Sequence, residues 1–140
     1  MSNIRFHTED ISFKLPKPRK TVFWLKSILL KEKAAFSFIN FIFCSDKFLL
    51  ELNQKYLSHS DYTDIITFQL NDKSLPIESE IYISIDRVKE NAKIYEQAFS
   101  EELLRVMAHG ILHLVGYKDK KPAEKVLMRK KESAYLSLFK

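Results

Sequence analysis

The feature that most constrains this chain is a segment, residues 100–116, that is apolar on nearly every side. Helical stepping of about 100° per residue gathers its polar residues into one stripe roughly 80° wide. The stripe consists of Glu102, Arg105, His109, His113 and Gly116. A helix that is hydrophobic all round is a buried one, and buried polar groups need partners. The segment therefore predicts a central helix whose polar face lines a cleft or a metal ion, although Glu102 and Arg105 can simply pair with each other.

The two histidines of this stripe, His109 and His113, stand four residues apart. Side chains at this spacing lie one above the other on a helix, so both rings can turn toward one point about 2.0–2.1 Å from each nitrogen, as zinc requires. The alternative is a pair of satisfied core histidines. Their shared polar stripe on an otherwise apolar helix favours half of a metal site.

A third ligand is expected in the turn after this helix. Gly116 suits the left-handed residue that ends a helix and Pro122 suits the first turn of the next, so residues 117–121 form a tight reversal. Asp119 lies in this reversal, and the chain from His113 could span about 20 Å if extended, which leaves ample slack. The alternative for Asp119 is a solvated or capping carboxylate. Competing ligand candidates are His59, His7 and Cys44.

The motif around the histidines resembles a known signature. The run from His109 to Asp119, HGILHLVGYKD, is similar to the HGxLHLxGYDH pattern of the YbeY family of metal-dependent single-strand endoribonucleases. Upstream, residues 52–68 resemble the family segment LNxxYR followed by TDVLSF. The resemblance extends over essentially the whole chain. It implies the family's architecture, a role in ribosomal RNA processing, particularly maturation of the 16S rRNA 3′ end, and a role in ribosome quality control.

Two positions depart from the family pattern. Asp119 stands where the family has its third histidine, and Lys118 where it has the preceding aspartate. The implied ligand set, His109, His113 and Asp119, therefore has two nitrogens and one oxygen. One zinc ion accepts this set, and the carboxylate widens the range of acceptable divalent metals.

Leu57 stands where the family pattern has an arginine that is expected to meet the phosphate backbone. A leucine cannot replace that charge. Candidates that could supply it are Lys55, His59, Arg105 and the basic residues around Asp119.

The order of predicted elements gives the fold class. Hydrophobic patterning predicts strands at residues 3–7, 36–44, 63–70 and 80–85. Helices are predicted at residues 21–31, 46–56, 86–99, 100–116 and 122–138. Asp46, Asp86 and Ser100 are expected to cap the three middle helices. Segment 36–44 is apolar on both faces, so it is central, and the last two strands form a hairpin. We predict one small α+β domain, 1–140, with a mixed sheet of about four strands and helices packed on it.

The charge pattern favours a phosphate-rich partner. Lysine and arginine outnumber the acidic residues 23 to 18, and Lys118, Lys120 and Lys121 flank the proposed ligand. A solvated face is the alternative for the basic residues further along. Tyr62 and Tyr117 are candidate base-stacking platforms. The expected partner is single-stranded RNA, either rRNA or the ribosome, and neither DNA nor a membrane is expected. One cysteine and the lack of a leader-like start predict a cytoplasmic protein.

The reaction expected is hydrolysis of an RNA phosphodiester, with the metal polarising a phosphoryl oxygen and lowering the pKa of water from about 15.7 toward 7. Gly110 occupies the place where HExxH metalloproteases carry glutamate, which argues against a peptidase. The general base is left open between Glu102, Asp64 and hydroxide on the metal. The main rival is an RNA- or ribosome-binding protein with a structural metal and little nuclease activity. A hydrolase of small phosphorylated or amide substrates is a further alternative.

Overall fold

A mixed sheet forms the centre of the computed structural model, which describes residues 3–57 and 62–139. Within this part of the chain the strands are β1 (Ile4–Thr8), β2 (Phe36–Cys44), β3 (Ile65–Gln69) and β4 (Ile77–Ser84). Their order in space is β1-β2-β4-β3. β2 runs parallel to both β1 and β4, and β3 pairs antiparallel with β4 as the expected hairpin. The inner position of β2 explains why it is apolar on both faces.

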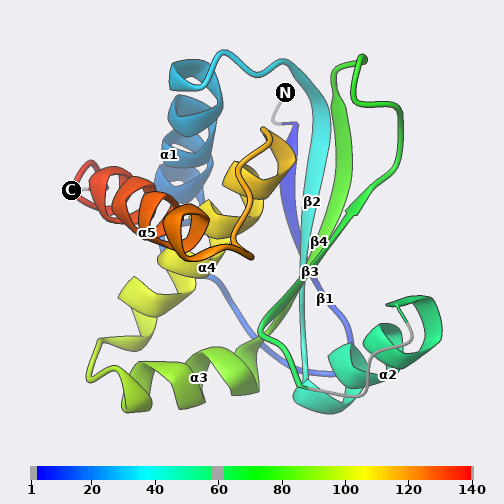
Figure 1. Cartoon of the computed structure of the whole chain (residues 1–140). Helices are drawn as coiled ribbons and strands as arrows, with labels where there is room; N and C mark the ends of the chain where they lie inside the picture. Colours follow the sequence, from blue (N-terminus) through cyan, green and yellow to red (C-terminus); the bar gives the residue numbers. More distant parts are fainter. Residues whose placement is uncertain (1–2, 58–61, 140) are drawn as a thin grey trace.

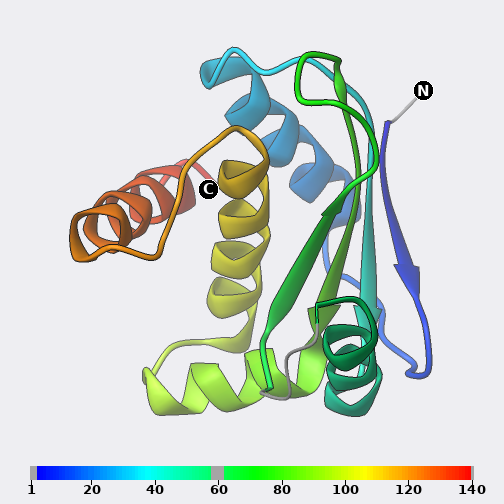
Figure 2. The ribbon, with the colours of Figure 1, turned by 45° about the vertical axis from the view of Figure 1, so that its right-hand side comes forward.

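Helices cover both faces of the sheet. They are α1 (Pro18–Lys31), α2 (Asp46–Leu57), α3 (Ile85–Ile94), α4 (Phe99–Leu114) and α5 (Pro122–Leu136). Figures 1 and 2 show α4 between the sheet and α5, with α1 and α3 on the same side and α2 on the opposite face. The described residues thus form one α+β domain with the histidine helix at its centre, as the sequence predicts.

The core is divided by the sheet into a large and a small part. The large part joins α1, α4 and the inward face of β2 and β4, and includes Leu25, Phe41, Ile81 and Met107, all buried. The small part lies under α2, around Leu49 and other residues of the opposite face. Apolar residues on nearly all sides of α4 are therefore explained, because this helix contacts the sheet on one side and other helices around it.

Gly110 lets α4 approach the sheet closely. A Cβ at this position would lie 2.9 Å from Ile65 Cδ1 and 3.3 Å from Ile81 Cδ1. Any larger residue would therefore press against two isoleucines of the hairpin. Because His109 and His113 flank this contact in the sequence, their position relative to β3 and β4 depends on it.

The expected helix caps at Asp46 and Asp86 are wrong. Ser45 Oγ accepts the N–H of Phe48 (3.1 Å), and Ser84 Oγ accepts the N–H of Arg87 (3.1 Å), so each helix begins after a serine. The two aspartates lie in the first helical turns and make tertiary contacts. Asp46 binds Arg87 Nη2 (2.8 Å), and Asp86 accepts the N–H of Asp46 (2.9 Å).

The expected cap at Ser100 is also wrong, because α4 begins at Phe99 and its N-cap residue, Ala98, offers no side-chain hydrogen bond. The preceding residue, Gln97, donates its backbone N–H to Ala92 O at the end of α3 (2.8 Å), so the α3–α4 connection is held by backbone contacts. Across the described ranges, no helix is both long enough and apolar enough to cross a membrane.

Candidate metal centre

The helix α4 places two imidazoles on one side of the molecule. His109 and His113 lie one turn apart, and their ring centroids are 4.9 Å from each other. The side chain of His109 is 21% exposed and that of His113 is 39% exposed. The stripe that carries them therefore runs from the interior toward solvent, which is the setting of an accessible site rather than of core histidines.

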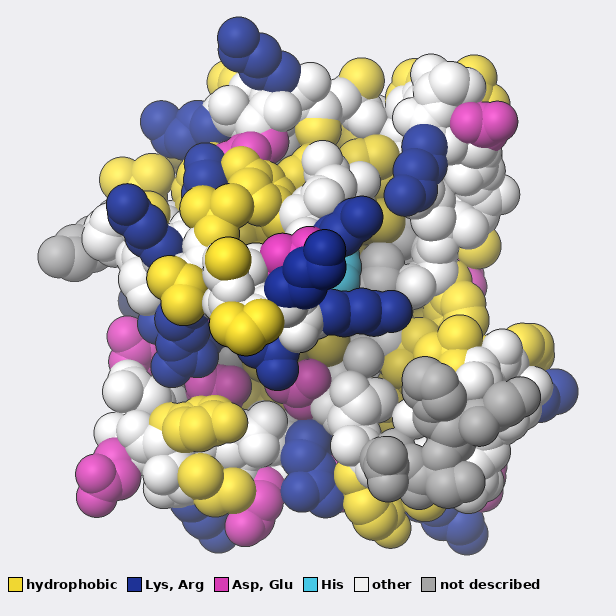
Figure 3. Space-filling model, viewed as in Figure 1, with side chains coloured by type: hydrophobic (Ala, Val, Ile, Leu, Met, Phe, Trp, Pro, Cys, Tyr) yellow, Lys and Arg dark blue, Asp and Glu magenta, His cyan; other side chains and the backbone are white. Residues whose placement is uncertain are grey.

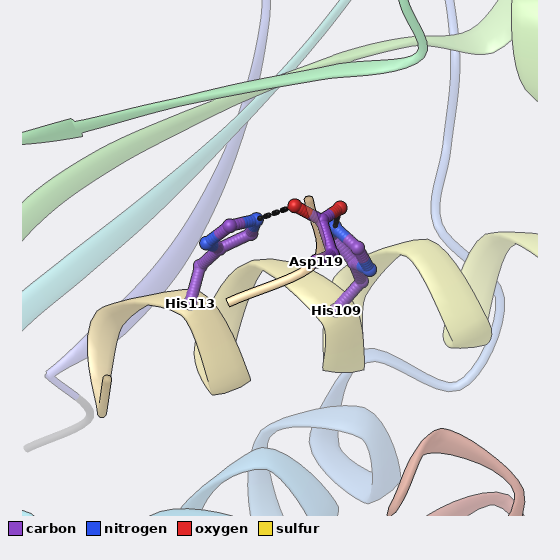
Figure 4. Close-up of side chains that lie close together, drawn as sticks. All are labelled: His109, His113 and Asp119. Atoms are coloured by element: carbon purple, nitrogen blue, oxygen red, sulfur yellow. Dashed lines mark ion pairs between the residues drawn. The ribbon is translucent and has the colours of Figure 1, made fainter. Parts of the chain in front are cut away.

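The turn after α4 carries the third side chain. Gly116 has a φ of 113°, and the N–H of Tyr117 bonds back to Leu112 O (3.0 Å), which ends the helix as its glycine predicts. Pro122 occupies the first turn of α5. Between these points the chain reverses, and Asp119 points back toward the two rings (Figure 4). Its Oδ2 lies 3.2 Å from His109 Nε2, and its Oδ1 lies 3.3 Å from His113 Nε2.

These three side chains fit a divalent metal ion. Each offers one ligand atom, and the atoms lie within 4.8 Å of one another. The carboxylate meets the two rings through different oxygens, Oδ2 on the side of His109 and Oδ1 on the side of His113. A metal ion with ligand distances of about 2.0–2.2 Å would lie between these three side chains. Two imidazole nitrogens and one carboxylate oxygen also form a donor set that zinc accepts.

Glu132 of α5 orients the first imidazole. Its Oε2 lies 2.7 Å from His109 Nδ1, and its Oε1 accepts a hydrogen bond from Arg105 Nη1 (3.1 Å). Arg105 also donates to Ser133 Oγ (3.2 Å). With Nδ1–H donated to a carboxylate, Nε2 of His109 is left to face Asp119, which is the arrangement found around metal-bound histidines. The alternative in which Arg105 simply pairs with Glu102 is not the one observed, because Arg105 binds Glu132 and Ser133 of α5.

Glu132 could not be assigned to the site from the motif, but the sequence contains a signal. Its side chain is only 6% exposed. The buried positions of α5 are Met128, Glu132 and Tyr135, which share one helical face. A glutamate on this otherwise apolar face needs a buried partner.

The two histidines have different electrostatic surroundings. Burial acts to lower the pKa of His109, but the hydrogen bond and charge of Glu132, together with Asp119, raise it above its ordinary value. For His113, burial and the neighbouring His109 lower the pKa despite Asp119. The ring nearer to solvent is therefore neutral around pH 7, which is the form that binds metals.

An open groove of about 550 Å³ borders these side chains. Its described lining includes His109, His113, Asp119, Asp64 and, on the opposite wall, residues of α2 and the β3–β4 hairpin. Leu57 is among them and is 44% exposed, so the departure from the family arginine falls on the groove itself. Lys73 contributes a positive charge to this lining. Figure 3 shows lysine and arginine side chains gathered around the visible histidine surface.

The predicted RNA-binding lysines lie beside the groove rather than in its lining. Lys118, Lys120 and Lys121 are exposed on the turn that carries Asp119, and the described lining includes none of them. Lys55 is exposed and lies 5.2 Å from the ring of Tyr56, away from the lining.

A smaller hollow of about 200 Å³ lies beside His109. Glu102 and Asp64 both line it. Glu102 is 4% exposed, and its buried Oε1 has no hydrogen-bond partner among the described residues. Burial raises the pKa of both carboxyls, and the charge of Asp64 raises that of Glu102 further. Asp64 also lines the larger groove, as do His109 and Asp119, whereas Glu102 does not.

The other candidates lie elsewhere or outside the described residues. His7 is exposed on β1, and Cys44 is a buried free cysteine whose pKa is raised by burial to about 12. His59 lies outside the described residues. Of the two candidate stacking residues, Tyr62 lines the groove and is 56% exposed, whereas Tyr117 donates its hydroxyl to Glu32 (2.8 Å).

Comparison with known proteins decides the family. A family model described as Endoribonuclease YbeY matches residues 3–140. The chain belongs to the YbeY family. A YbeY endoribonuclease of Cytophaga hutchinsonii is 49% identical over 137 residues, covering 98% of this chain and 96% of that protein. A second, from Amoebophilus asiaticus, is 48% identical over 135 residues, covering 96% and 92%.

A solved structure supports the same fold. The solution structure of TM1509 from Thermotoga maritima matches with a TM-score of 0.64 and 32% sequence identity. The match covers 97% of this chain and 88% of that protein. The α+β arrangement described for this YbeY family member therefore has a counterpart determined by experiment.

Proposed function

We propose that the protein is a metal-dependent endoribonuclease that cuts single-stranded RNA. The observation that carries this proposal is the convergence of His109, His113 and Asp119 at the edge of an open groove, in a chain that belongs to the YbeY family. Its substrate is ribosomal RNA, the reaction includes maturation of the 16S rRNA 3′ end, and the protein takes part in ribosome quality control. It works in the cytoplasm as one domain over residues 1–140.

His109, His113 and Asp119 would hold one zinc ion, or another divalent metal that accepts nitrogen and oxygen donors. When bound, such an ion would supply a Lewis acid for a phosphoryl oxygen and would lower the pKa of water toward about 7. Glu132 accepts the Nδ1–H of His109 and so presents Nε2 to the site. The carboxylate of Asp119 balances part of the positive charge there.

Asp64 is the residue that we assign to proton transfer. It lines the groove in which the RNA would lie, whereas Glu102 lines the smaller hollow beside His109 and not the groove. A carboxyl whose pKa is raised by burial accepts a proton more readily than an ordinary aspartate. Glu102 is buried next to it, and burial together with the charge of Asp64 raises the pKa of Glu102 as well.

The RNA backbone would be held by lysines on two sides of the groove. Lys73 reaches it from the β3–β4 hairpin, and Lys118, Lys120 and Lys121 flank it on the turn after α4. Lys73 is therefore our candidate for the phosphate contact that Leu57 cannot make. Each phosphate contact made by a lysine contributes to the loss of affinity as salt rises.

Cleavage of matched RNA substrates tests the proposal. Purified protein, with its metal content measured, is given an end-labelled single-stranded RNA or the same RNA annealed to its complement. We expect the single strand to be cut, the duplex to resist, and a chelator to stop the reaction until zinc is restored. The Lys73→Ala variant should show weaker substrate binding with unchanged metal content.

Two outcomes would reject the nuclease assignment. Tight RNA binding without cleavage at full metal occupancy would indicate an RNA-binding protein with a structural metal. Indifference to RNA would indicate a hydrolase of smaller substrates. The His7→Ala variant is the matched control for the site histidines, because His7 is an exposed histidine on β1.

A further inference from the structure

A glutamate at the end of α1 collects hydrogen bonds from two distant parts of the chain. Glu32 Oε1 accepts from the Tyr117 hydroxyl (2.8 Å), and Oε2 accepts from Lys131 Nζ (3.2 Å) and from the Tyr135 hydroxyl. The Glu32 side chain is 10% exposed. A carboxylate withdrawn from water to this extent needs such donors, and charged hydrogen bonds of this kind are stronger and more directional than neutral ones.

The Tyr117 contact bears on the proposed metal ligand. Tyr117 lies two residues before Asp119, and its backbone N–H is already bonded to the end of α4. On the other side of Asp119, the backbone N–H groups of Lys120 and Lys121 donate to Glu124 Oε1 (3.2 and 2.8 Å). The aspartate therefore sits on a short span between two anchored points, and the Glu32–Tyr117 bond is the anchor that comes from outside the α4–α5 region.

The other two donors tie α5 to the same glutamate. Lys131 immediately precedes Glu132, whose carboxylate holds His109. Tyr135 is further fixed because its carbonyl oxygen accepts from Trp24 Nε1 (2.8 Å), so α1 and α5 are joined at two points. Burial acts to raise the pKa of Glu32, but the hydrogen bonds from Tyr135, Tyr117 and Lys131 together lower it, so the side chain stays ionised at neutral pH.

We propose that Glu32 is a positioning residue for the metal centre: by holding the Tyr117 hydroxyl it fixes the turn at residues 115–121 so that the Asp119 carboxylate meets the two histidines. This inference rests on the proposed role of Asp119 as a ligand. Among the described residues, Glu32 has no hydrogen bond or ion pair with the three proposed ligands and does not line the groove, so its effect on Asp119 passes through Tyr117 and the turn.

Two tyrosines provide a matched pair of variants. Tyr117→Phe and Tyr135→Phe each remove one hydroxyl donor from Glu32, but only Tyr117 belongs to the turn that carries Asp119. Glu32→Gln keeps the size of the side chain while removing its charge. A role confined to helix packing predicts similar zinc affinities for all variants, whereas positioning of Asp119 predicts that Tyr117→Phe and Glu32→Gln weaken zinc binding and Tyr135→Phe does not.

The measurement is zinc affinity, determined by competition with a chromophoric chelator, together with the visible spectrum of the Co²⁺-loaded protein. We expect the zinc affinity of Tyr117→Phe and Glu32→Gln to fall about 10-fold, a size typical of residues that orient metal ligands. Their Co²⁺ spectra should change because the aspartate is less well held, and combining the two substitutions should add little to either alone. Thermal unfolding in chelator reports the stability of each metal-free variant separately.

The outcomes separate this inference from the function on which it rests. Stoichiometric zinc in the wild type with unchanged affinity and spectrum in Tyr117→Phe and Glu32→Gln would overturn the positioning role alone. An equal loss of affinity in Tyr135→Phe would also overturn it in favour of general packing. A wild-type protein that binds no zinc or Co²⁺ would reject the metal centre itself, and the positioning role with it.

Discussion

The two histidines on α4 and the aspartate in the turn that follows are held in place by different means. His109 and His113 owe their relation to the periodicity of α4, and Gly110 between them sets the helix against Ile65 and Ile81. Asp119 has no regular element to place it. Its turn is fixed by a glycine at the helix end and by hydrogen bonds to Glu32 and Glu124. The spacing of the two histidines is thus specified within one helix, whereas the turn that carries Asp119 also depends on Glu32, a residue far away in the sequence.

Removing a helix-borne ligand should have the largest effect. We expect His113→Ala to lose stoichiometric metal and to reduce RNA cleavage by about 100-fold or more, because one carboxylate and one imidazole do not hold zinc firmly. Elemental analysis of the purified variant gives the metal content. His7→Ala should keep both metal and activity. Full metal occupancy in His113→Ala would mean that the ligands are not those proposed.

The second largest effect is expected at Glu132, the residue that supports His109. Glu132→Gln weakens the orientation of His109 and leaves Arg105 without a carboxylate partner. We expect zinc affinity to fall about 10- to 100-fold, more than for Glu32→Gln, because Glu132 contacts a ligand directly. The same chelator competition measures both variants, and Glu101→Gln, at an exposed position of α4, is the control. A larger loss in Glu32→Gln would reverse the comparison.

The same contrast explains which parts of the molecule the sequence predicts. The apolar run and His-x-x-x-His spacing predict the central helix, and Gly116 with Pro122 predicts the turn that brings Asp119 to the histidines. These signals are local. Whether the three residues bind metal remains a proposal that the metal measurements test.

Contacts between distant segments could not be predicted in this way. Glu132, Glu32 and Lys73 reach the site or its supports from other elements, and nothing in the motif identifies them. The helix caps at Asp46 and Asp86 were wrong for the same reason, because tertiary hydrogen bonds engage these carboxylates and a preceding serine caps each helix. A capping preference is local, and a partner 40 residues away can override it.

A substitution at Gly110 tests how α4 is positioned against the sheet without changing a ligand. An added methyl group at position 110 costs about 1–3 kcal/mol by overpacking against Ile65 and Ile81, while alanine gains about 1 kcal/mol in helix propensity. We expect Gly110→Ala to be less stable by about 1 kcal/mol, measured by urea unfolding in chelator. Ile65→Val removes the closest atom, so Gly110→Ala should cost less stability in an Ile65→Val background than in the wild type. An equal cost in both backgrounds would show that the close approach is not what limits this position.

The smallest effect, and the one that depends most on pH, is expected for the contribution of Glu32 to stability. The pKa of Glu32 is lowered in the folded protein, so the stability that its charge contributes is complete above the ordinary carboxylate pKa and is lost as the pH falls through the lowered value. The metal-free wild type should therefore be more stable than Glu32→Gln at neutral pH, and the difference should narrow in acid as Glu32 is protonated. Thermal unfolding of both proteins in chelator, from neutral pH down to below the ordinary carboxylate pKa, measures this difference. The other carboxylates are the same in the two proteins, so their contributions to the pH dependence cancel from the difference in stability. A difference that stays constant or widens in acid would show that the charge of Glu32 does not stabilise the folded protein through its contacts with Tyr117, Lys131 and Tyr135.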